Sequence, residues 1–175
     1  MIIKDVENFY KIITLKEFRR TKDVRFDVLD ASLIPRIDSF DRVIHGPGAL
    51  SPGSVGNVEH PWYMHPYQED NLMVLRGTRR IDIYTPKHGK VEHFSVTADK
   101  VCRGNKVCHT GSAMLVWSCG VFHRIVSCPD QGSISLNFAV RYEGFDIRTN
   151  FNIYDLDTKS GEYEIIRAGH LDQQT

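Results

Sequence analysis

The chain has 175 residues, of which 41% are hydrophobic and 25% are charged, a composition typical of one globular domain rather than a disordered or coiled-coil chain. Its 22 basic and 22 acidic side chains give a formal net charge of zero, which argues against nucleic-acid binding because nucleic-acid binders usually carry a basic excess. Charged residues interrupt the apolar residues of the N-terminal segment, so it lacks the apolar region of a signal peptide. The longest apolar run, residues 113–117, is far shorter than the roughly 20 residues that cross a bilayer. We therefore expect a cytoplasmic protein without a membrane partner.

The N-terminal third of the chain has no single clear pattern of secondary structure. Residues 12–18 suit a strand or a helical turn, and residues 24–29 alternate like a strand. Residues 45–61 are rich in glycine and proline, which excludes a long helix there. We expect residues 1–45 to form an extension that packs on the main body.

A series of short β segments follows. Each segment is rich in β-branched, apolar or aromatic residues, and turn-forming residues separate one segment from the next. The expected strands cover residues 62–65, 70–76, 79–84, 91–96, 113–117, 121–126 and 133–140. Short strands at this spacing predict an all-β sandwich or barrel.

The expected strand at residues 70–76 is apolar on both faces, since Leu72 and Val74 alternate with Met73 and Leu75. Only one face of a barrel strand points inward, so a second layer, a terminal extension or a partner subunit must cover the other. Residues 150–167 are predicted to form a β-hairpin. Because closed two-fold dimers are the commonest homo-oligomers, we expect a homodimer in which this hairpin or the first strands of the chain cover the outer sheet.

Two histidines have a distinctive place in the sequence. Four residues separate His65 from Asp70, and six more separate Asp70 from Gly77. His123 begins a later strand, after Gly111 and a glycine turn at residues 118–120. These two sets of residues, the first around His65 and the second around His123, resemble in this order the two motifs of the cupin superfamily, in its small RmlC-like single-domain form. The sequence departs from the family pattern at Tyr63, where the family has its first histidine, and at the acid, which is the shorter aspartate.

The resemblance implies a fold class and a metal site. The fold is an all-β double-stranded β-helix, or jelly roll, with the cupin barrel at residues 46–142 and a C-terminal hairpin and tail at residues 143–175, within one domain overall. His65, Asp70 and His123 are expected to point into the barrel and bind a divalent metal ion such as Fe, Mn, Zn or Ni. Two imidazoles and a carboxylate form the facial triad typical of non-haem iron. Glu69 is the alternative to Asp70 as the carboxylate ligand.

The expected function is a small metal-binding cupin that binds or transforms a small organic molecule inside the barrel, as a metal-dependent oxygenase or isomerase if it is an enzyme. In this account Tyr63 orients the substrate. One alternative is a metal-free cupin that binds a small molecule as a sensor or sequestering module. A second is an isomerase or epimerase that uses a histidine and a tyrosine as base and acid, and a third is a purely structural dimerising module.

The four cysteines all lie within residues 102–128. Their spacings contain no close pair of the zinc-knuckle type, and thiols normally stay reduced in the cytosol. We expect Cys119, which lies within the second motif's glycine turn, to be a small buried thiol rather than a nucleophile.

Overall fold

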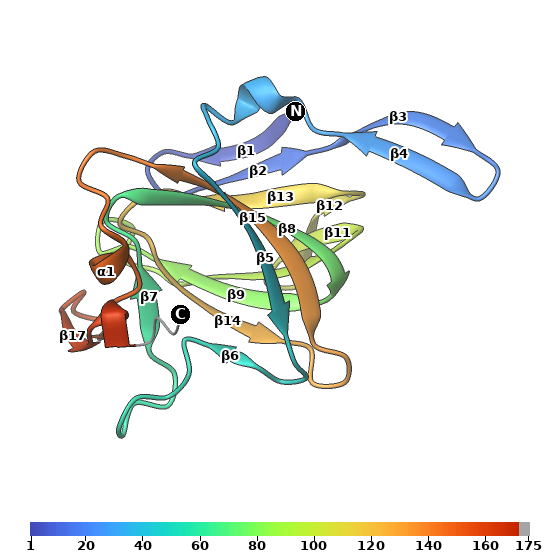
Figure 1. Ribbon diagram of the computed structural model, residues 1–175. Coiled ribbons are helices and arrows are strands. Elements are labelled where there is room, and N and C mark those ends of the chain that lie inside the picture. The colour runs from blue at the N-terminus through green and yellow to red at the C-terminus, as the bar shows by residue number, and fades with distance from the viewer. Residues whose placement is uncertain (172–175) are drawn as a thin grey trace.

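The computed structural model describes residues 1–171 and consists almost entirely of antiparallel β-strands (Figure 1). The strands are β1 (Ile2–Val6), β2 (Tyr10–Thr14), β3 (Lys16–Thr21), β4 (Val24–Val28), β5 (Ser39–His45), β6 (Leu50–Ser51), β7 (Trp62–Met64), β8 (Gln68–Gly77), β9 (Arg79–Tyr84), β10 (Glu92–Thr97), β11 (Lys100–Arg103), β12 (Lys106–Thr110), β13 (Ala113–Trp117), β14 (Phe122–Ser127), β15 (Ser133–Arg141), β16 (Ile153–Leu156) and β17 (Tyr163–Arg167). The short helices are η1 (Ala31–Leu33), α1 (Ile147–Asn150) and η2 (Gly169–Leu171). No helix within residues 1–171 is both long and apolar enough to cross a bilayer.

Two large sheets face each other and enclose the core. Within residues 1–171, one sheet has six strands in the order β1-β2-β13-β8-β15-β5. The other has nine, in the order β12-β11-β10-β9-β14-β7-β16-β17, with β6 paired to β14. The predicted all-β architecture is therefore confirmed. The seven strands expected between residues 62 and 140 are all present, with ends that differ by at most two residues.

The sequence pattern does not predict three strands in and around the barrel. β11 and β12 are short and carry charged or polar residues at most positions, so their alternation is weak. β5 precedes residue 46 and pairs with β15 at seven positions from Ser39 to His45, so the barrel sheet begins earlier in the chain than expected. The expected N-terminal extension thus supplies strands to the barrel as well as packing on it.

Two glycines allow one end of the barrel to close. Gly77, the last residue of β8, and Gly132, just before β15, both have a positive φ, +73° and +64°. A Cβ on Gly77 would collide with the carbonyl oxygen of Gly132, and one on Gly132 would collide with that of His45. Only glycine fits these positions, where β5, β8 and β15 come together.

The N-terminal segment covers the outer face of the six-stranded sheet. Ile34 is buried there against Met114, Val116 and the partly buried Met73 of β8, together with the partly buried Leu29, Leu33 and Leu15. Leu75 is 46% exposed, so the outer face of β8 is only partly covered. The C-terminal hairpin lies elsewhere: β16 pairs with β7 and extends the other sheet. That hairpin is therefore not the cover of β8 within this chain.

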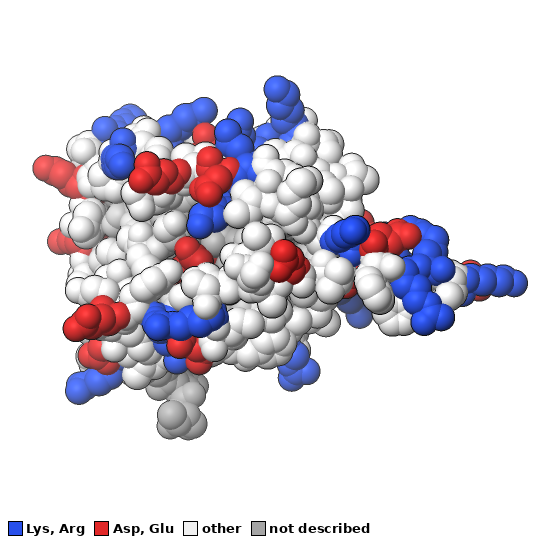
Figure 2. Space-filling model, turned by 90° about the horizontal axis from the view of Figure 1, so that it is seen from above, with Lys and Arg blue, Asp and Glu red and all other residues white. Residues whose placement is uncertain are grey.

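A two-stranded hairpin, β3–β4, projects from the body (Figure 1). Apolar side chains are exposed along it, including Phe18 at 75% and Phe26 at 49%. Figure 2 shows lysine and arginine side chains gathered on this projection. We call residues 16–28 the arm.

Candidate functional site

A cavity of about 230 Å³ lies between the two sheets. Its buried wall comes from β8, β9, β13 and β14, which contribute Asp70, Leu72, Arg79, Trp117, His123 and Ile125. Its half-exposed lining residues belong to β5, β6, β7, β15 and the segment after α1, and include Asp41, Val43, Tyr63 and Phe151. The cavity therefore opens between the edge strand β5 and the β6–β7 side of the other sheet.

Three candidate ligands meet in this cavity. His65 directly follows β7, Asp70 lies on β8 and His123 lies on β14. All three are buried, and one ligand atom from each lies within 4.8 Å of the others. His65 Nε2 is 3.3 Å from Asp70 Oδ2. Residues that are up to 58 positions apart in the sequence are thus brought together by strand pairing.

Neighbouring amides fix the Asp70 carboxylate. Gln68 Nε2 and Asn137 Nδ2 each donate a hydrogen bond to Asp70 Oδ1, at 2.8 Å. Gln68 Oε1 in turn accepts a hydrogen bond from Asn150 Nδ2 at 3.3 Å. Because Oδ1 is fully engaged, Oδ2 is the oxygen left for His65 or for a ligand.

Both imidazoles are oriented by backbone carbonyl groups. His65 Nδ1 lies 2.5 Å from the Asn150 carbonyl oxygen, and His123 Nδ1 lies 3.3 Å from that of Val121. A carbonyl oxygen only accepts, so each Nδ1 carries the proton. The Nε2 atom is the nitrogen that remains for a substrate, a metal ion or Asp70.

The two imidazoles have opposite pKa shifts. Burial disfavours the charged form of both. For His65 the adjacent Asp70 carboxylate outweighs burial and raises the pKa, whereas burial and the neighbouring His65 charge lower the pKa of His123 to about 3. Burial alone would raise the pKa of Asp70, but the charge and hydrogen bond of His65 hold it well below its usual value. These shifts favour the charged forms of His65 and Asp70 and the neutral form of His123.

Aromatic side chains surround the imidazoles. The Tyr63 ring centre lies 6.3 Å from that of His65 and 5.9 Å from that of His123. Trp117 lies 5.0 Å from His123. Within residues 1–171, the buried atoms Trp117 Nε1 and Asn137 Oδ1 have no hydrogen-bond partner, and both side chains line the cavity. Unpaired buried polar atoms suit a polar ligand or ordered water.

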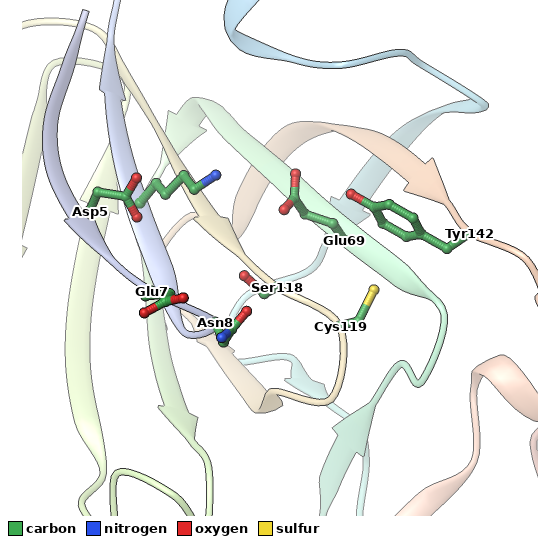
Figure 3. A pocket seen from close by; sticks show the side chains of 8 residues that line it. Asp5, Glu7, Asn8, Glu69, Ser118, Cys119 and Tyr142 are labelled. Atoms are coloured by element: carbon green, nitrogen blue, oxygen red, sulfur yellow. The ribbon is translucent and has the colours of Figure 1, made fainter.

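Glu69 lies in a different place from the other candidate ligands. It lines an outer pocket with Ser118, Cys119, Tyr142 and N-terminal residues (Figure 3). Because strand residues alternate between faces, Asp70 points into the barrel and Glu69 out of it.

Cys119 also lines the outer pocket, where burial and nearby carboxylates raise the pKa of its thiol to about 11. Cys119 is therefore a poor nucleophile at neutral pH.

Sequence reasoning missed several residues of the cavity wall. Gln68 and Asn137 line the cavity and donate to Asp70, and Asn150 of α1 supports them by donating to Gln68. The contacts of Asn137 and Asn150 join separate elements, and no local pattern marks such contacts. Arg79 was open to detection, because it shares the inward face of β9 with Ile81 and Ile83, where a charged residue is out of place.

The three candidate ligands fit a divalent metal ion. Two imidazole nitrogens and one carboxylate oxygen face one another, and the Nδ1 bonds to carbonyl groups are the outer contacts that usually orient metal-binding histidines. The shorter side chain of Asp70 reaches the site, although the family's usual acid is longer.

No family model and no curated protein matches this sequence. Solved structures do match in shape. The sugar 3,4-ketoisomerase QdtA from Thermoanaerobacterium thermosaccharolyticum, solved with TDP, has a TM-score of 0.55 at 14% identity, over 81% of this chain and 85% of QdtA. A dTDP sugar isomerase from Desulfovibrio desulfuricans G20 has a TM-score of 0.55 at 12% identity, over 82% of this chain and 83% of that one.

A sugar epimerase extends the comparison. NovW, a 4-keto-6-deoxy sugar epimerase from Streptomyces spheroides, has a TM-score of 0.55 at 13% identity, over 81% of this chain and 66% of NovW. These similar structures are RmlC-like cupins. The chain therefore has the RmlC-like cupin fold, and the predicted fold class is confirmed.

Proposed function

We propose that the protein is an isomerase or epimerase that moves a proton at a carbon next to the carbonyl group of a small polar molecule, such as a keto sugar. The observation that carries the proposal is the pair of buried imidazoles with opposite pKa shifts in one cavity. Titratable neighbours whose environments drive their pKa values apart are the usual arrangement of an acid and a base. The barrel shared with sugar isomerases supports the same choice.

In the proposed reaction His123 is the base and His65 the acid. His123 Nε2 takes the proton from the carbon, the C–H electron pair forms a carbon–carbon double bond, and the carbonyl oxygen takes a proton from His65 Nε2. In an isomerase, His123 then returns its proton to the former carbonyl carbon while His65 takes a proton from the neighbouring hydroxyl group. In an epimerase the intermediate turns within the site, so that His123 returns its proton to the first carbon on its other face while His65 takes back the proton of the enol oxygen. Neither route needs an oxidant or a reductant.

The Asp70 carboxylate stabilises the charged form of His65 without binding the His65 Nε2 proton tightly. The 3.3 Å separation of His65 Nε2 and Asp70 Oδ2 is longer than the 2.7–2.9 Å typical of charge-assisted hydrogen bonds. The His65 proton is therefore available to a substrate oxygen. Tyr63, at the rim beside both imidazoles, is the residue we assign to orient the substrate.

Hydrogen exchange tests this function without knowledge of the natural product. The protein is incubated in D₂O with a panel of neutral and acidic keto sugars that includes TDP-4-keto-6-deoxyglucose, the ligand of a QdtA variant. We expect deuterium to enter the carbon beside a carbonyl group, detected by NMR. If no member of the panel takes up deuterium above the rate without protein, the proposal is wrong.

A second candidate function is divalent metal binding by His65, Asp70 and His123. The specific observation in its favour is that both Nδ1 atoms bind carbonyl groups, which presents both Nε2 atoms to the carboxylate. A bound metal ion would polarise a substrate oxygen. The residues would then hold the ion, and Tyr63 would only contact substrate.

Metal analysis and one variant separate the two candidates. Stoichiometric metal in protein purified without chelator, lost in a His65→Ala/His123→Ala variant, supports the second candidate. Activity that persists in metal-free protein and is lost in the same variant supports a proton-transfer enzyme. Activity that requires the bound metal would argue against the first candidate.

We also propose that the protein forms a homodimer through the arm. A two-stranded hairpin alone is at best marginally stable in water, and this one exposes Phe18, Phe26 and neighbouring valines. A second copy that covers these side chains would remove them from water.

A further inference from the structure

Arg79 is a buried cation at the far end of the cavity from the imidazoles. It is 2% exposed, lines the cavity and begins β9. Across the sheet it pairs with Ser127 of β14, whereas His123 pairs with Ile83. Four residues along a strand span about 13 Å, so the cavity has one polar end at Arg79 and another at the imidazoles. The apolar side chains of Leu72 and Ile125 also line the cavity.

Within the described residues 1–171, most N–H donors of the Arg79 guanidinium have no hydrogen-bond partner. Nε donates to Ser133 Oγ at 3.0 Å, and Nη2 donates to the Val43 carbonyl oxygen at 3.3 Å. An arginine has five N–H donors, so three are left over. Within residues 1–171, no carboxylate lies within the 4.0 Å of an ion pair with Arg79, and burial lowers its pKa to about 10, which still leaves it charged at neutral pH.

The groups around Arg79 do not neutralise it. Ser133 Oγ and Ser127 Oγ are 2.8 Å apart, and His45 Nδ1 lies 2.9 Å from Ser127 Oγ. Burial and the Arg79 charge lower the pKa of His45 to about 4, so His45 is neutral. Asp41, the other acid of the cavity wall besides Asp70, accepts a hydrogen bond from Ser39 and contributes to the raised pKa of His65 rather than pairing with Arg79. This end of the cavity therefore has a net positive charge.

We propose that Arg79 binds a carboxylate group of the substrate, so that the reaction at the other end of the cavity acts on a small keto acid or acidic keto sugar. A buried guanidinium without a counter-ion is unfavourable, and a carboxylate matches its planar set of donors. The cavity of about 230 Å³ is smaller than the 300–1,000 Å³ typical of pockets for drug-sized ligands, which favours a compact acid over a nucleotide group. The reaction at the imidazole end of the cavity rests on the proposed proton-transfer function, whereas acid binding at Arg79 does not.

The direct probe is the ¹⁵N–¹H signal of Arg79 Nε, assigned by comparison with an Arg79→Lys variant. Keto acids and uronic acids of three to six carbons are titrated in parallel with analogues that carry CH₂OH in place of the carboxylate. We expect at least one acid to move the signal saturably and its neutral analogue to bind at least tenfold more weakly. Equal binding of each acid and its analogue, or no saturable shift with any acid, would overturn the inference.

Three variants separate a binding role from a structural one. Arg79→Met has an apolar side chain of similar length, and we expect an unchanged or higher melting temperature with loss of acid binding, because an unpaired buried charge is removed. Arg79→Lys should weaken acid binding about tenfold, since it keeps the charge but loses the fork of donors. Arg80→Met, at the exposed next position on β9, is the control and should bind as the unaltered chain does. A large fall in melting temperature in Arg79→Met, with acid binding retained in Arg79→Lys, would identify a structural arginine.

The two proposals fail in different ways. If acids bind at Arg79 but no keto compound exchanges deuterium, the proton-transfer function is wrong and the acid site stands. If neutral keto sugars exchange as fast as acidic ones, and Arg79→Met exchanges as fast as the unaltered chain, the acid site is wrong and the function stands.

Discussion

The cavity and the arm depart from the usual distribution of side chains in opposite directions. In the cavity, charged groups such as His65, Asp70 and Arg79 are 2–4% exposed. On the arm, Phe18 and Phe26 are 75% and 49% exposed. Burial of charge and exposure of large apolar groups both lower stability unless something binds there. Each region is therefore the place where we propose a contact that the isolated chain leaves unmade: a polar ligand in the cavity and a second copy at the arm.

The largest expected effect is on proton transfer in the cavity. His65→Asn and His123→Asn each remove one proton-transfer group while keeping a polar side chain of comparable size. We expect deuterium exchange to fall about 10²–10⁴-fold in each variant. His93→Asn, at a largely exposed histidine on β10, is the matched control. Exchange that survives in both cavity variants would remove the acid and base assigned here.

Asp70 and Glu69 give a direct comparison of the two faces of β8. Asp70→Asn removes the charge that pairs with the buried His65, and we expect the free energy of unfolding at neutral pH to fall by about 3 kcal/mol. Glu69→Gln, in the outer pocket, should change it by less than about 0.5 kcal/mol. Urea denaturation measures both. Equal losses in the two variants would mean that the ion pair does not set the stability of the cavity.

The arm variants test the other half of the comparison. Phe18→Ser/Phe26→Ser should convert a dimer, of twice the 20.1 kDa chain mass, into a monomer in light scattering. Replacement of the exposed Tyr163 of β17 by serine is the control for the C-terminal hairpin and should leave the dimer intact. A mass of 20.1 kDa for the unaltered chain in dilute solution would contradict the dimer.

The smallest expected effect concerns acid pH. The pKa of His45 is about 4 in the folded chain because of burial and Arg79, against an ordinary value near 6.5. The unfolded chain therefore binds more protons between pH 6.5 and 4, and stability is lost as the pH falls through this range. His45→Gln should flatten the pH dependence of the melting temperature between pH 6.5 and 4. An unchanged slope would mean that the pKa of His45 is not lowered in the folded protein.

The sequence predicts the barrel better than it predicts the chemistry of its cavity. The strand pattern marks β8, β9, β13, β14 and β15 because apolar or aromatic side chains recur along each of them. It fails for β11 and β12, whose pairing is fixed by neighbouring strands rather than by an apolar face of their own.

For the site, motif spacing identifies His65, Asp70 and His123 as neighbours, and the fold brings them together. The pKa difference between the two imidazoles and the unpaired state of Arg79 depend on burial and on cross-strand partners. These are properties of the packed barrel, so no local pattern carries them.

Deuterium uptake after metal removal tests the central claim most directly. The protein is treated with a strong chelator, its metal content is measured, and exchange from D₂O into acidic and neutral keto sugars is followed at neutral pH. Our account predicts that exchange persists at an unchanged rate in metal-free protein, because the chain's own His65 and His123 move the proton. Exchange that disappears with the metal and returns with its addition would contradict the account and support the metal site instead.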